Sequence, residues 1–580
     1  MMPPVAANTI TARELGPRGS RAAVAESDPA AELPEQARRV LAAVPGWWAA
    51  RAAAAGLSGR WRDISQALDV AAPDETAGNE PDPAITDETT AHDLGGAYVG
   101  ALAPQVRARH GRHYTPTELA EELWSMTRRA LGLPSKVARR LPGLIRDPAC
   151  GAGALLLPPL QEHLAATRRG DPEVVITELG HLIEGIDIDP AAVWLANAAL
   201  AAEALPLLAA VPARRRRPLP ALARVGDGLM PGLSPSRVTI MNPPYGRVRL
   251  STADRERFAT TVYGHANLYG LFIAAALEHL DGYGVLAAVI PTSFTAGRYF
   301  QNLRAMISDS APLEEIAFVT ERDGVFAGVL QETCLAVFSR QRQQHTVITS
   351  LNGSRAGVAT VTPPGSAEPW LLPRRPGDVP VAAAAIAMPL TLATAGWRAS
   401  TGPLVWNRRR HDLYPRPGRN RVPIVWAADL DGGVLHRDQT RDQLRYLELT
   451  QPSDHAVMLL TQPAVLVQRT TAPEQSRRLV VTDLTPELLD EWGGAVAVEN
   501  HVNVLRPTLP APLLGRAVLA QVLATATMDT LMRCTSGSVA VSAYELESLP
   551  LPAAQTLHCW EPLTGASLDT AIAAAYRPSR

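Results

Sequence analysis

The sequence predicts an α/β protein built on a Rossmann-like sheet, with a small helical region before the sheet and a mixed α+β region after it. Three observations support this fold class. Short apolar strands alternate with helical segments between residues 91 and 340. An acid or an amide follows each of four successive strands. Beyond residue 340 the alternation stops, and short strands and turns dominate.

The composition limits the class of protein. A chain of 580 residues with 46% hydrophobic residues can form several domains and excludes a mostly disordered protein. The formal net charge is −2, so affinity for nucleic acid requires a local basic patch. Lys136 is the only lysine among many arginines, which is typical of high-GC bacterial genomes.

Four dispersed cysteines argue against a zinc site and for a reducing cytoplasm. The N-terminus does not resemble a signal peptide, and the most apolar stretch, residues 379–397, contains two prolines and is predicted to form a short buried helix. We therefore expect a cytoplasmic bacterial protein with no metal and no membrane partner.

Residues 1–90 are predicted to form a Pro/Ala/Gly-rich tail, a helical appendage over residues 32–68 and an acidic linker over residues 71–87. A second helical pattern, residues 92–109, leads into Tyr114-Thr115-Pro116-Thr117-Glu118. Thr117 after Pro116 indicates a helix start, whose free amide groups can receive an anionic group.

The first strand of the alternating region ends in Asp147-Pro148-Ala149-Cys150-Gly151-Ala152-Gly153. Gly151 and Gly153 allow the backbone to approach a ligand closely, and Asp147 can hold a cationic amine. The same glycines also occur in turns that serve packing alone. The third glycine of the dinucleotide-binding fingerprint is missing.

Polar residues also follow the next three strands. The second ends in Ile186-Asp187-Ile188-Asp189-Pro190, where an acid at the strand tip can accept hydrogen bonds from two ribose hydroxyls and Asp189 suits capping of the following helix. The third is followed by Asp227 and Gly228, and the fourth by Asn242. Because ligands bind at the carboxyl ends of such strands, these side chains are expected to line one crevice.

The fourth strand stops at Asn242-Pro243-Pro244-Tyr245. The Asn242 side-chain oxygen and the Pro243 carbonyl could accept both hydrogens of a ring-conjugated amine and free its lone pair. Two prolines fix the backbone and remove competing donors. Tyr245 offers a flat face to an extruded base. A Pro-Pro turn beside a buried tyrosine is the structural alternative.

Taken together, these motifs resemble the gamma class of DNA N6-adenine methyltransferases, most clearly over residues 94–340. The resemblance implies S-adenosylmethionine as the cofactor and Asn242, Pro243, Pro244 and Tyr245 as the catalytic residues. In the family, the acid corresponding to Asp187 holds the ribose and that corresponding to Asp227 the adenine amine. The implied cofactor-binding residues are Tyr114, Thr115, Asp147, Ala149, Gly151, Gly153, Asp187, Ile188, Asp227, Gly228 and Phe272.

The region over residues 341–580 is expected to recognise the target. Seven arginines and one acid lie within residues 398–421, and arginines interleaved with aromatics suit phosphate contact and base reading, although a solvated basic face has the same pattern. Arg408, Arg409 and Arg410 are the predicted DNA contacts. Phe326 is the predicted second wall of the base pocket, with a core phenylalanine as the alternative. Residues 468–471 and 499–503 resemble segments of target-recognition domains.

The predicted domains are residues 1–90, 91–340 and 341–580. The predicted function is transfer of a methyl group to N6 of a flipped adenine in double-stranded DNA by a monomer, as the modification half of a restriction-modification system. The common nuclease signature needs an acid two residues before a lysine, and Pro134 stands there, so a separately encoded restriction endonuclease is the expected partner. The alternatives are a subunit of a multi-protein phage-defence system, a methyltransferase acting on protein glutamine or RNA, and a non-catalytic DNA-binding subunit.

Overall fold

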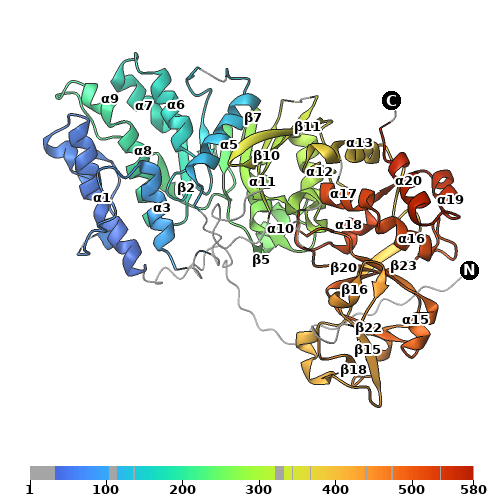
Figure 1. Ribbon diagram of the computed structural model, residues 1–580. Coiled ribbons are helices and arrows are strands. Elements are labelled where there is room, and N and C mark those ends of the chain that lie inside the picture. Colours follow the sequence, from blue (N-terminus) through green and yellow to red (C-terminus); the bar gives the residue numbers. More distant parts are fainter. Residues whose placement is uncertain are drawn as a thin grey trace, which may run out of the picture.

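The computed structural model describes residues 33–578 except for 77, 104–106, 108–113, 135–136, 320–331, 342–343, 366, 438–441, 472–474 and 536 (Figure 1). The predicted base-pocket residue Phe326 lies outside the described residues, as does Lys136.

A nine-stranded mixed sheet forms the centre of the molecule, with the strand order β11-β10-β8-β9-β7-β4-β1-β2-β3 (Figure 1). The five strands from β3 to β7 in this order are parallel, as the alternating pattern predicts. β9 runs antiparallel to both of its neighbours, and β11 is an antiparallel edge strand. The strands are β1 (Ile145–Asp147), β2 (Ile183–Asp187), β3 (Ala223–Val225), β4 (Ser236–Met241), β7 (Leu280–Pro291), β8 (Leu313–Val319), β9 (Thr333–Ser339), β10 (Thr346–Asn352) and β11 (Ser354–Val361).

Helices cover both faces of this sheet, which explains why β7 is apolar from Val285 to Ile290. In β7, Val285, Ala287 and Val289 join one hydrophobic cluster, and the alternate residues of the strand join another. The first cluster includes residues of α3 (Ala91–Ala101), α5 (Thr117–Ala130), α6 (Leu157–Ala166), α7 (Pro172–Leu182) and α8 (Pro190–Glu203). The second includes residues of α11 (Leu268–His279) and α12 (Gln301–Ser310).

The N-terminal helix α1 (Glu35–Ala54) is part of this core, so the predicted division at residue 90 is wrong. It packs against α3 and α8, and Trp48 is fully buried in the cluster that contains Trp194 and Ile145. The reason is that the N-terminal tryptophans have a large apolar surface, and burial of this surface against α8 stabilises the folded chain. The predicted helical stretch is also interrupted, since α1 is followed by the 3-10 helix η1 (Gly59–Arg62) and by α2 (Ile64–Ala67).

The predicted boundary at residue 340 also lies inside the sheet. β10 pairs in parallel with β8, and β11 pairs with β10, so the sheet extends to Val361. Half-buried Val358, Ala359 and Val361 pack against the second hydrophobic cluster. The additional hairpin thus covers apolar surface that would otherwise face water.

The C-terminal region contains two smaller sheets and a group of helices, in agreement with the predicted mixed α+β class. One sheet comprises β13 (Trp397–Thr401), β23 (Val502–Pro507), β20 (Ala464–Gln468) and β21 (Val481–Leu484). The other comprises β14 (Leu413–Tyr414), β18 (Tyr446–Glu448), β15 (Arg421–Val425), β22 (Val496–Val498) and β19 (Leu459–Leu460). The helices are α13 (Val379–Ile386), α16 (Arg516–Leu523), α17 (Ala526–Thr535), α18 (Ala543–Glu547), α19 (Ala554–Trp560) and α20 (Gly565–Ala575).

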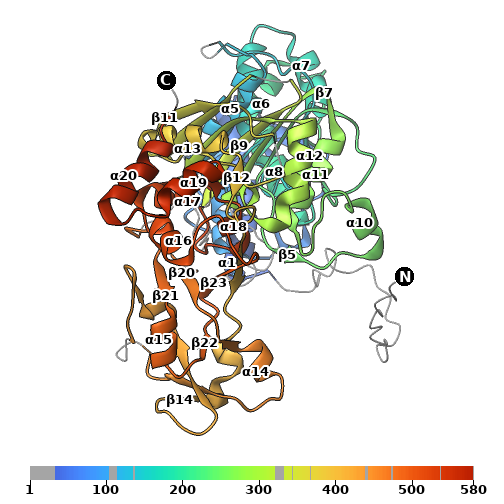
Figure 2. The ribbon, with the colours of Figure 1, turned by 90° about the vertical axis from the view of Figure 1, so that its right-hand side faces the viewer.

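The sheet with β15, β18 and β22 projects away from the nine-stranded sheet, whereas the helices adjoin it (Figures 1 and 2). Arg304 of α12 forms hydrogen bonds both within the region of the nine-stranded sheet and to the start of the C-terminal region. Its buried guanidinium donates hydrogen bonds to the carbonyls of Phe294 and Gly297 in one half and to the Ala367 carbonyl at the start of the other.

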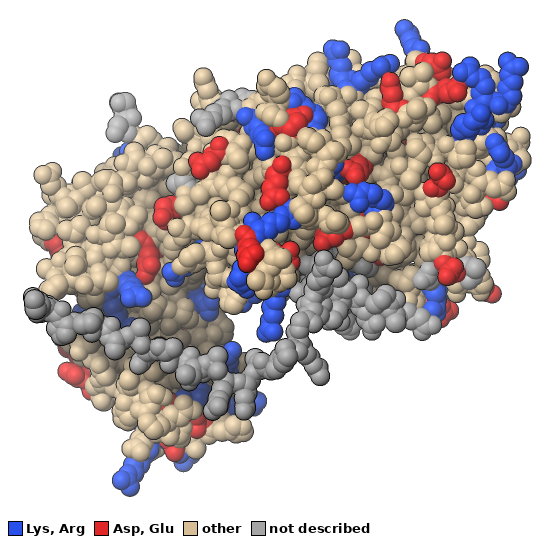
Figure 3. All heavy atoms as spheres, turned by 180° about the vertical axis from the view of Figure 1, so that it is seen from behind, with Lys and Arg blue, Asp and Glu red and all other residues tan. Residues whose placement is uncertain are grey.

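Within the apolar stretch over residues 379–397, only Val379–Ile386 form the short helix α13, in which Ala382 and Ala385 are buried and Ile386 is exposed. No helix in the described part of the chain is long and apolar enough to cross a membrane. On the face shown in Figure 3, basic and acidic side chains are interspersed, in line with the small net charge.

Candidate active site

The crevice predicted from the strand ends lies at the point where the strand order reverses. β1 and β4 are neighbours in the sheet, and the chain continues from β1 to one side and from β4 to the other. In open parallel sheets this is where ligands bind, beyond the carboxyl ends of the strands. The loop that begins at Asp147 and the segment that begins at Asn242 leave the sheet here, side by side.

The loop after β1 has a fixed conformation. Gly151 and Gly153 have φ angles of 49° and 88°, in the left-handed region that favours glycine. The Gly151 amide donates a hydrogen bond to Asp187 Oδ2 at 2.8 Å, which ties the loop to the end of β2. A Cβ atom at Gly153 would lie 3.3 Å from that of Ala196, so this glycine also lets α8 approach.

Two carboxyl groups lie near each other at this loop. Asp147 is 1% exposed and accepts a hydrogen bond from the Ala149 amide at 3.0 Å. Burial raises the pKa of Asp147 well above its ordinary value, and the neighbouring Asp187 adds to this effect. A cationic ligand group beside these acids would offset the energetic cost of burying their charged forms and would reduce the repulsion between them.

The ends of β2 and β3 complete the same side of the crevice. Ile188, directly after Asp187, is 40% exposed, which is unusual for a large apolar side chain at the edge of a core. At Gly228 a Cβ atom would lie only 1.8 Å from the Pro148 carbonyl oxygen, so the loop with Asp227 is pressed against the loop after β1. Phe272 of α11 is 7% exposed and belongs to the hydrophobic cluster against which Ala149 packs.

The amide of Asn242 is oriented by two hydrogen bonds. Its Nδ2 donates to Thr115 Oγ1 at 3.0 Å, and its Oδ1 accepts from the Tyr245 hydroxyl at 2.9 Å. The reversed amide would place donors against the tyrosine hydroxyl, which can bond only by turning its proton away.

Tyr245 is half-buried. Its hydroxyl lies 2.9 Å from Asn242 Oδ1 and 3.1 Å from the Val289 carbonyl, and burial raises its pKa, so it remains a neutral donor. Its ring meets the Tyr269 ring edge-on, with 6.2 Å between centroids. Pro243 and Pro244 lie between Asn242 and Tyr245 in the sequence. Pro243 is buried and Pro244 is half-buried.

Tyr114 and Thr115 immediately precede α5, which starts at Thr117 as predicted. Thr115 is 3% exposed, and its carbonyl lies 2.9 Å from His92 Nε2. The Tyr114 hydroxyl donates a hydrogen bond to the His92 carbonyl, which holds the segment against α3. This segment therefore bridges from α3 to the Asn242 amide.

Sequence reasoning missed the contribution of α3. A Cβ atom at Gly95 would lie 2.8 Å from the Tyr114 ring and 2.9 Å from Cβ of Ala152, so α3 packs closely on both motifs. Tyr98 donates a hydrogen bond to Asp189 Oδ2 at 3.0 Å, while Asp189 caps α8 as predicted. The two glycines at 95 and 96 in a helical pattern were the available signal of close packing.

The arginines predicted to contact DNA are divided by the structure. Arg408 and Arg410 are exposed. Arg409 is 9% exposed and forms a bidentate ion pair with buried Asp454, at 2.8 and 2.9 Å, and a further contact of 2.6 Å with Asp412. This pairing lowers the pKa of Asp454 to about 2. Because its guanidinium is already occupied by carboxylates, Arg409 is not retained among the DNA contacts proposed below.

Part of the chain is similar to known restriction-modification proteins. Residues 237–326 match the model of the Eco57I restriction-modification methylase family, and this segment contains Asn242 to Tyr245. Two solved structures are loosely similar overall. The Type IIL restriction-modification enzyme MmeI in complex with DNA has 13% identity and a TM-score of 0.48 over 87% of this chain and 79% of that chain. The type IIG restriction endonuclease BpuSI has 14% identity and a TM-score of 0.44 over 93% and 72%.

Among curated proteins, the type II methyltransferase M.PstI of Providencia stuartii is 25% identical over 332 residues. M.BsuBI of Bacillus subtilis is 23% identical over 339 residues. Each alignment covers 55% of this chain, and the chain spans 65% of the length of each relative. The chain is thus similar to restriction-modification methylases over 55% of its length.

Proposed function

We propose that the protein is an S-adenosylmethionine-dependent DNA methyltransferase that modifies N6 of adenine as the modification half of a restriction-modification system. The observation that carries this proposal is the Asn242 amide, oriented by Thr115 and Tyr245 beside the glycine loop after β1. An oriented amide next to a ligand loop suits transfer to an amine.

The residues around the loop fit S-adenosylmethionine. Gly151 has open space where a side chain would stand, and the neighbouring acids Asp147 and Asp187 suit a ligand with cationic groups. Exposed Ile188 suits the apolar face of an adenine, and half-buried Asp227 suits its amine. The remaining proposed cofactor-binding residues are Tyr114, Thr115, Ala149, Gly153, Gly228 and Phe272. When bound, this cofactor supplies an electrophilic methyl group.

The chain itself prepares the accepting nitrogen. Asn242 Oδ1 and the Pro243 carbonyl accept the two hydrogens of the adenine amine, which leaves the nitrogen lone pair for the new N–C bond. The proton that the nitrogen then releases stays hydrogen-bonded to one of these oxygens until it passes to water. Positioning of two reactants can lower a barrier by roughly 7–11 kcal/mol, so no strongly basic residue is required.

The base reaches this site by leaving the duplex, because its amine is inaccessible within the stack. Tyr245 and Phe326 are the proposed walls for the extruded base, and Pro244 stiffens the segment between Asn242 and Tyr245. Exposed Arg408 and Arg410 are the proposed phosphate contacts on double-stranded DNA. We further propose a cytoplasmic monomer whose partner is a separately encoded restriction endonuclease.

The test uses the purified chain with labelled S-adenosylmethionine and unmethylated bacterial DNA, which is then digested to nucleosides. We expect label in N6-methyladenine. Asn242→Ala should abolish this label while cofactor binding, measured by calorimetry, persists. Arg60→Ala, an exposed residue of η1, is the matched control and should retain activity. Cofactor binding without label in DNA would refute autonomous DNA modification.

A further inference from the structure

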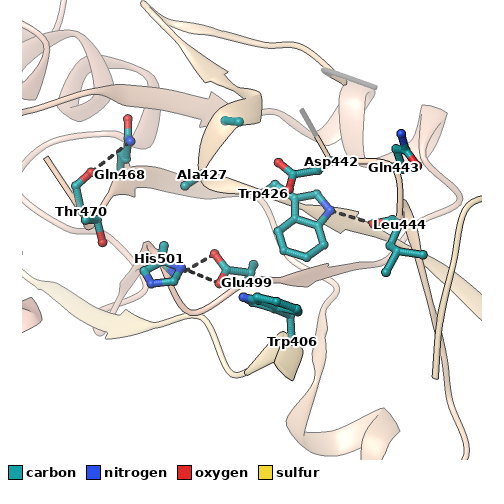
Figure 4. A pocket seen from close by; sticks show the side chains of 11 residues that line it. Trp406, Trp426, Ala427, Asp442, Gln443, Leu444, Gln468, Thr470, Glu499 and His501 are labelled. Atoms are coloured by element: carbon teal, nitrogen blue, oxygen red, sulfur yellow. Dashed lines mark hydrogen bonds and ion pairs between the residues drawn. The ribbon is translucent and has the colours of Figure 1, made fainter. Parts of the chain in front are cut away.

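A pocket of about 760 Å³ lies in the C-terminal region, far in sequence from the candidate active site. Its walls come from both small sheets. Gln468 ends β20 of the four-stranded sheet, and Trp426 follows β15 of the five-stranded sheet. The turn with Glu499 and His501 connects β22 of one sheet to β23 of the other. We call it the inter-sheet pocket (Figure 4).

The floor of the inter-sheet pocket is rigid. The Glu499 amide donates a hydrogen bond to the Val425 carbonyl, and the Asn500 amide donates to the Leu404 carbonyl. At Gly402 a Cβ atom would lie 2.3 Å from the Glu499 carbonyl oxygen, so the chain passes directly beneath the turn. Polar groups on such a supported turn keep their positions when a ligand binds.

Glu499 orients the imidazole of His501. The Glu499 carboxylate is 2% exposed and lies 2.7 Å from His501 Nδ1, while its other oxygen accepts from the His501 amide at 2.9 Å. A buried carboxylate stabilises the tautomer with the proton on Nδ1. The imidazole is 45% exposed, and its second nitrogen, Nε2, therefore serves as a hydrogen-bonding atom on the pocket side.

The other lining groups suit a flat heteroaromatic ligand. Trp406 is 37% exposed and contributes an indole face, and Trp426 forms a buried wall whose Nε1 donates to the Leu444 carbonyl at 2.9 Å. Gln468 uses one amide hydrogen on the Thr470 carbonyl, at 3.1 Å. Its amide has a second hydrogen and an oxygen, the pair that matches the N7 and N6 edge of adenine.

The charged residues suit different parts of DNA inside and outside the inter-sheet pocket. Glu499 and Asp442 make the inter-sheet pocket itself unfavourable for phosphate. Exposed Arg408 belongs to the same 3-10 helix as Trp406, η6 (Trp406–Arg408), and exposed Arg410 begins the next, η7 (Arg410–Asp412). Basic residues thus follow Trp406 of the pocket wall closely in the chain, so one segment supplies both a pocket wall and groups suited to phosphate.

We propose that the inter-sheet pocket binds base edges of the DNA target and determines the recognition sequence, with Gln468 and the Glu499–His501 pair as the reading groups. This rests on the proposed function, since it names the residues that select the DNA site. Trp406 supplies the apolar contact, and Arg408 and Arg410 hold the adjacent phosphates.

The experiment uses a DNA library with a randomised segment in two arms. In the first arm the full chain methylates the library, and methylated positions are found by sequencing. In the second arm the library is selected for binding alone, without cofactor. Both arms compare the wild type with Gln468→Ala and with the size-conserving Gln468→Glu. His455→Ala, an exposed residue of α14 (Asp454–Val457) in the same region, is the control.

We expect one site for the wild type and for the His455 control. Preference at one base pair should fall by roughly 5- to 150-fold in Gln468→Ala, the range for loss of one bidentate base contact. Gln468→Glu should change the preferred base at that position, because one donor becomes an acceptor. A variant counts as folded when its melting temperature equals that of the His455→Ala control.

Two outcomes separate the proposals. Unchanged preference in both arms for folded Gln468 variants overturns the role of the inter-sheet pocket and leaves the proposed function intact. Sequence-selective binding that Gln468→Ala relaxes, in a chain that transfers no methyl group to DNA, supports the pocket and refutes the proposed function. Binding of free nucleotides without any sequence selectivity in DNA also overturns the pocket's role.

Discussion

Replacement of Thr115 by valine tests whether the segment before α5 acts on catalysis. Valine has nearly the volume of threonine but lacks the oxygen that accepts the hydrogen bond from Asn242 Nδ2 at 3.0 Å. Thr115 is 3% exposed, so the shape of the site is preserved while one acceptor disappears. The amide of Asn242 then loses one of the two hydrogen bonds that orient it, and its oxygen no longer faces the target amine in every molecule.

The magnitude follows from the cost of an unpaired donor. A buried polar group that loses its partner costs about 1–3 kcal/mol. Asn242 is only half-buried, so water can compensate in part, and we expect the lower part of this range. A loss of about 1–2 kcal/mol of transition-state stabilisation lowers kcat by roughly 5- to 30-fold.

The assay measures kcat at saturating DNA and cofactor, together with the Kd for S-adenosylmethionine. Thr115→Ser keeps the oxygen and should retain kcat within about twofold of wild type. A folded Thr115→Val variant with wild-type kcat would refute the orienting role of Thr115. An equal loss in Thr115→Ser would show that the hydroxyl alone does not account for the effect and that the methyl group contributes as well.

Four further substitutions address the loops of the site and the arginine-rich segment. Burial raises the pKa of Asp147, so the carboxyl group lowers the stability of the folded protein above pH 3.8. Asp147→Asn should therefore stabilise the cofactor-free protein at pH 8 by about 1–2 kcal/mol in thermal melts, while it weakens cofactor binding. This gain in stability should vanish as the pH falls toward 3.8, and a destabilised variant would contradict the reasoning. Gly228→Ala places a methyl group 1.8 Å from the Pro148 carbonyl oxygen, so cofactor affinity measured by calorimetry should fall at least about tenfold, and unchanged affinity would show that the two loops separate easily. Arg409→Ala should destabilise the chain by roughly 3 kcal/mol in denaturant unfolding because it leaves the buried Asp454 carboxylate without its ion-pair partner. Arg408→Ala should leave stability unchanged and reduce the slope of the logarithm of DNA affinity against the logarithm of salt concentration by about one. If instead Arg408→Ala destabilised the chain and Arg409→Ala changed only this slope, Arg408 would be the structural residue and Arg409 the phosphate contact.

Much of the central sheet was predictable because its elements are encoded locally. The strand that ends at Asp147, the helix that begins at Thr117 and the cap at Asp189 occur where the pattern predicts them. Apolar runs, prolines and capping residues act over a few neighbours, so they can be recognised without knowledge of the fold.

The domain limits were not predictable in the same way. The helix with Trp48 has an ordinary amphipathic pattern, and only its packing on α8 shows that it belongs to the central core. The hairpin that ends at Val361 follows the alternating region without a helix, and its pairing with β8 depends on a distant strand. Arg409 was likewise indistinguishable from its neighbours until Asp454 was seen beside it.

The sequence by itself determined the alternating fold, the acids and the amide at four strand ends, and the resemblance to a methyltransferase family. Only the tertiary structure decided which of these side chains meet. Thr115 and Asn242 are separated by 127 residues and join through one hydrogen bond, and the inter-sheet pocket combines Trp406, Gln468 and His501 from separate elements. Local patterns specify strands and helices, whereas contacts between distant residues depend on the packing of the whole chain, and the chemistry of this protein resides in those contacts.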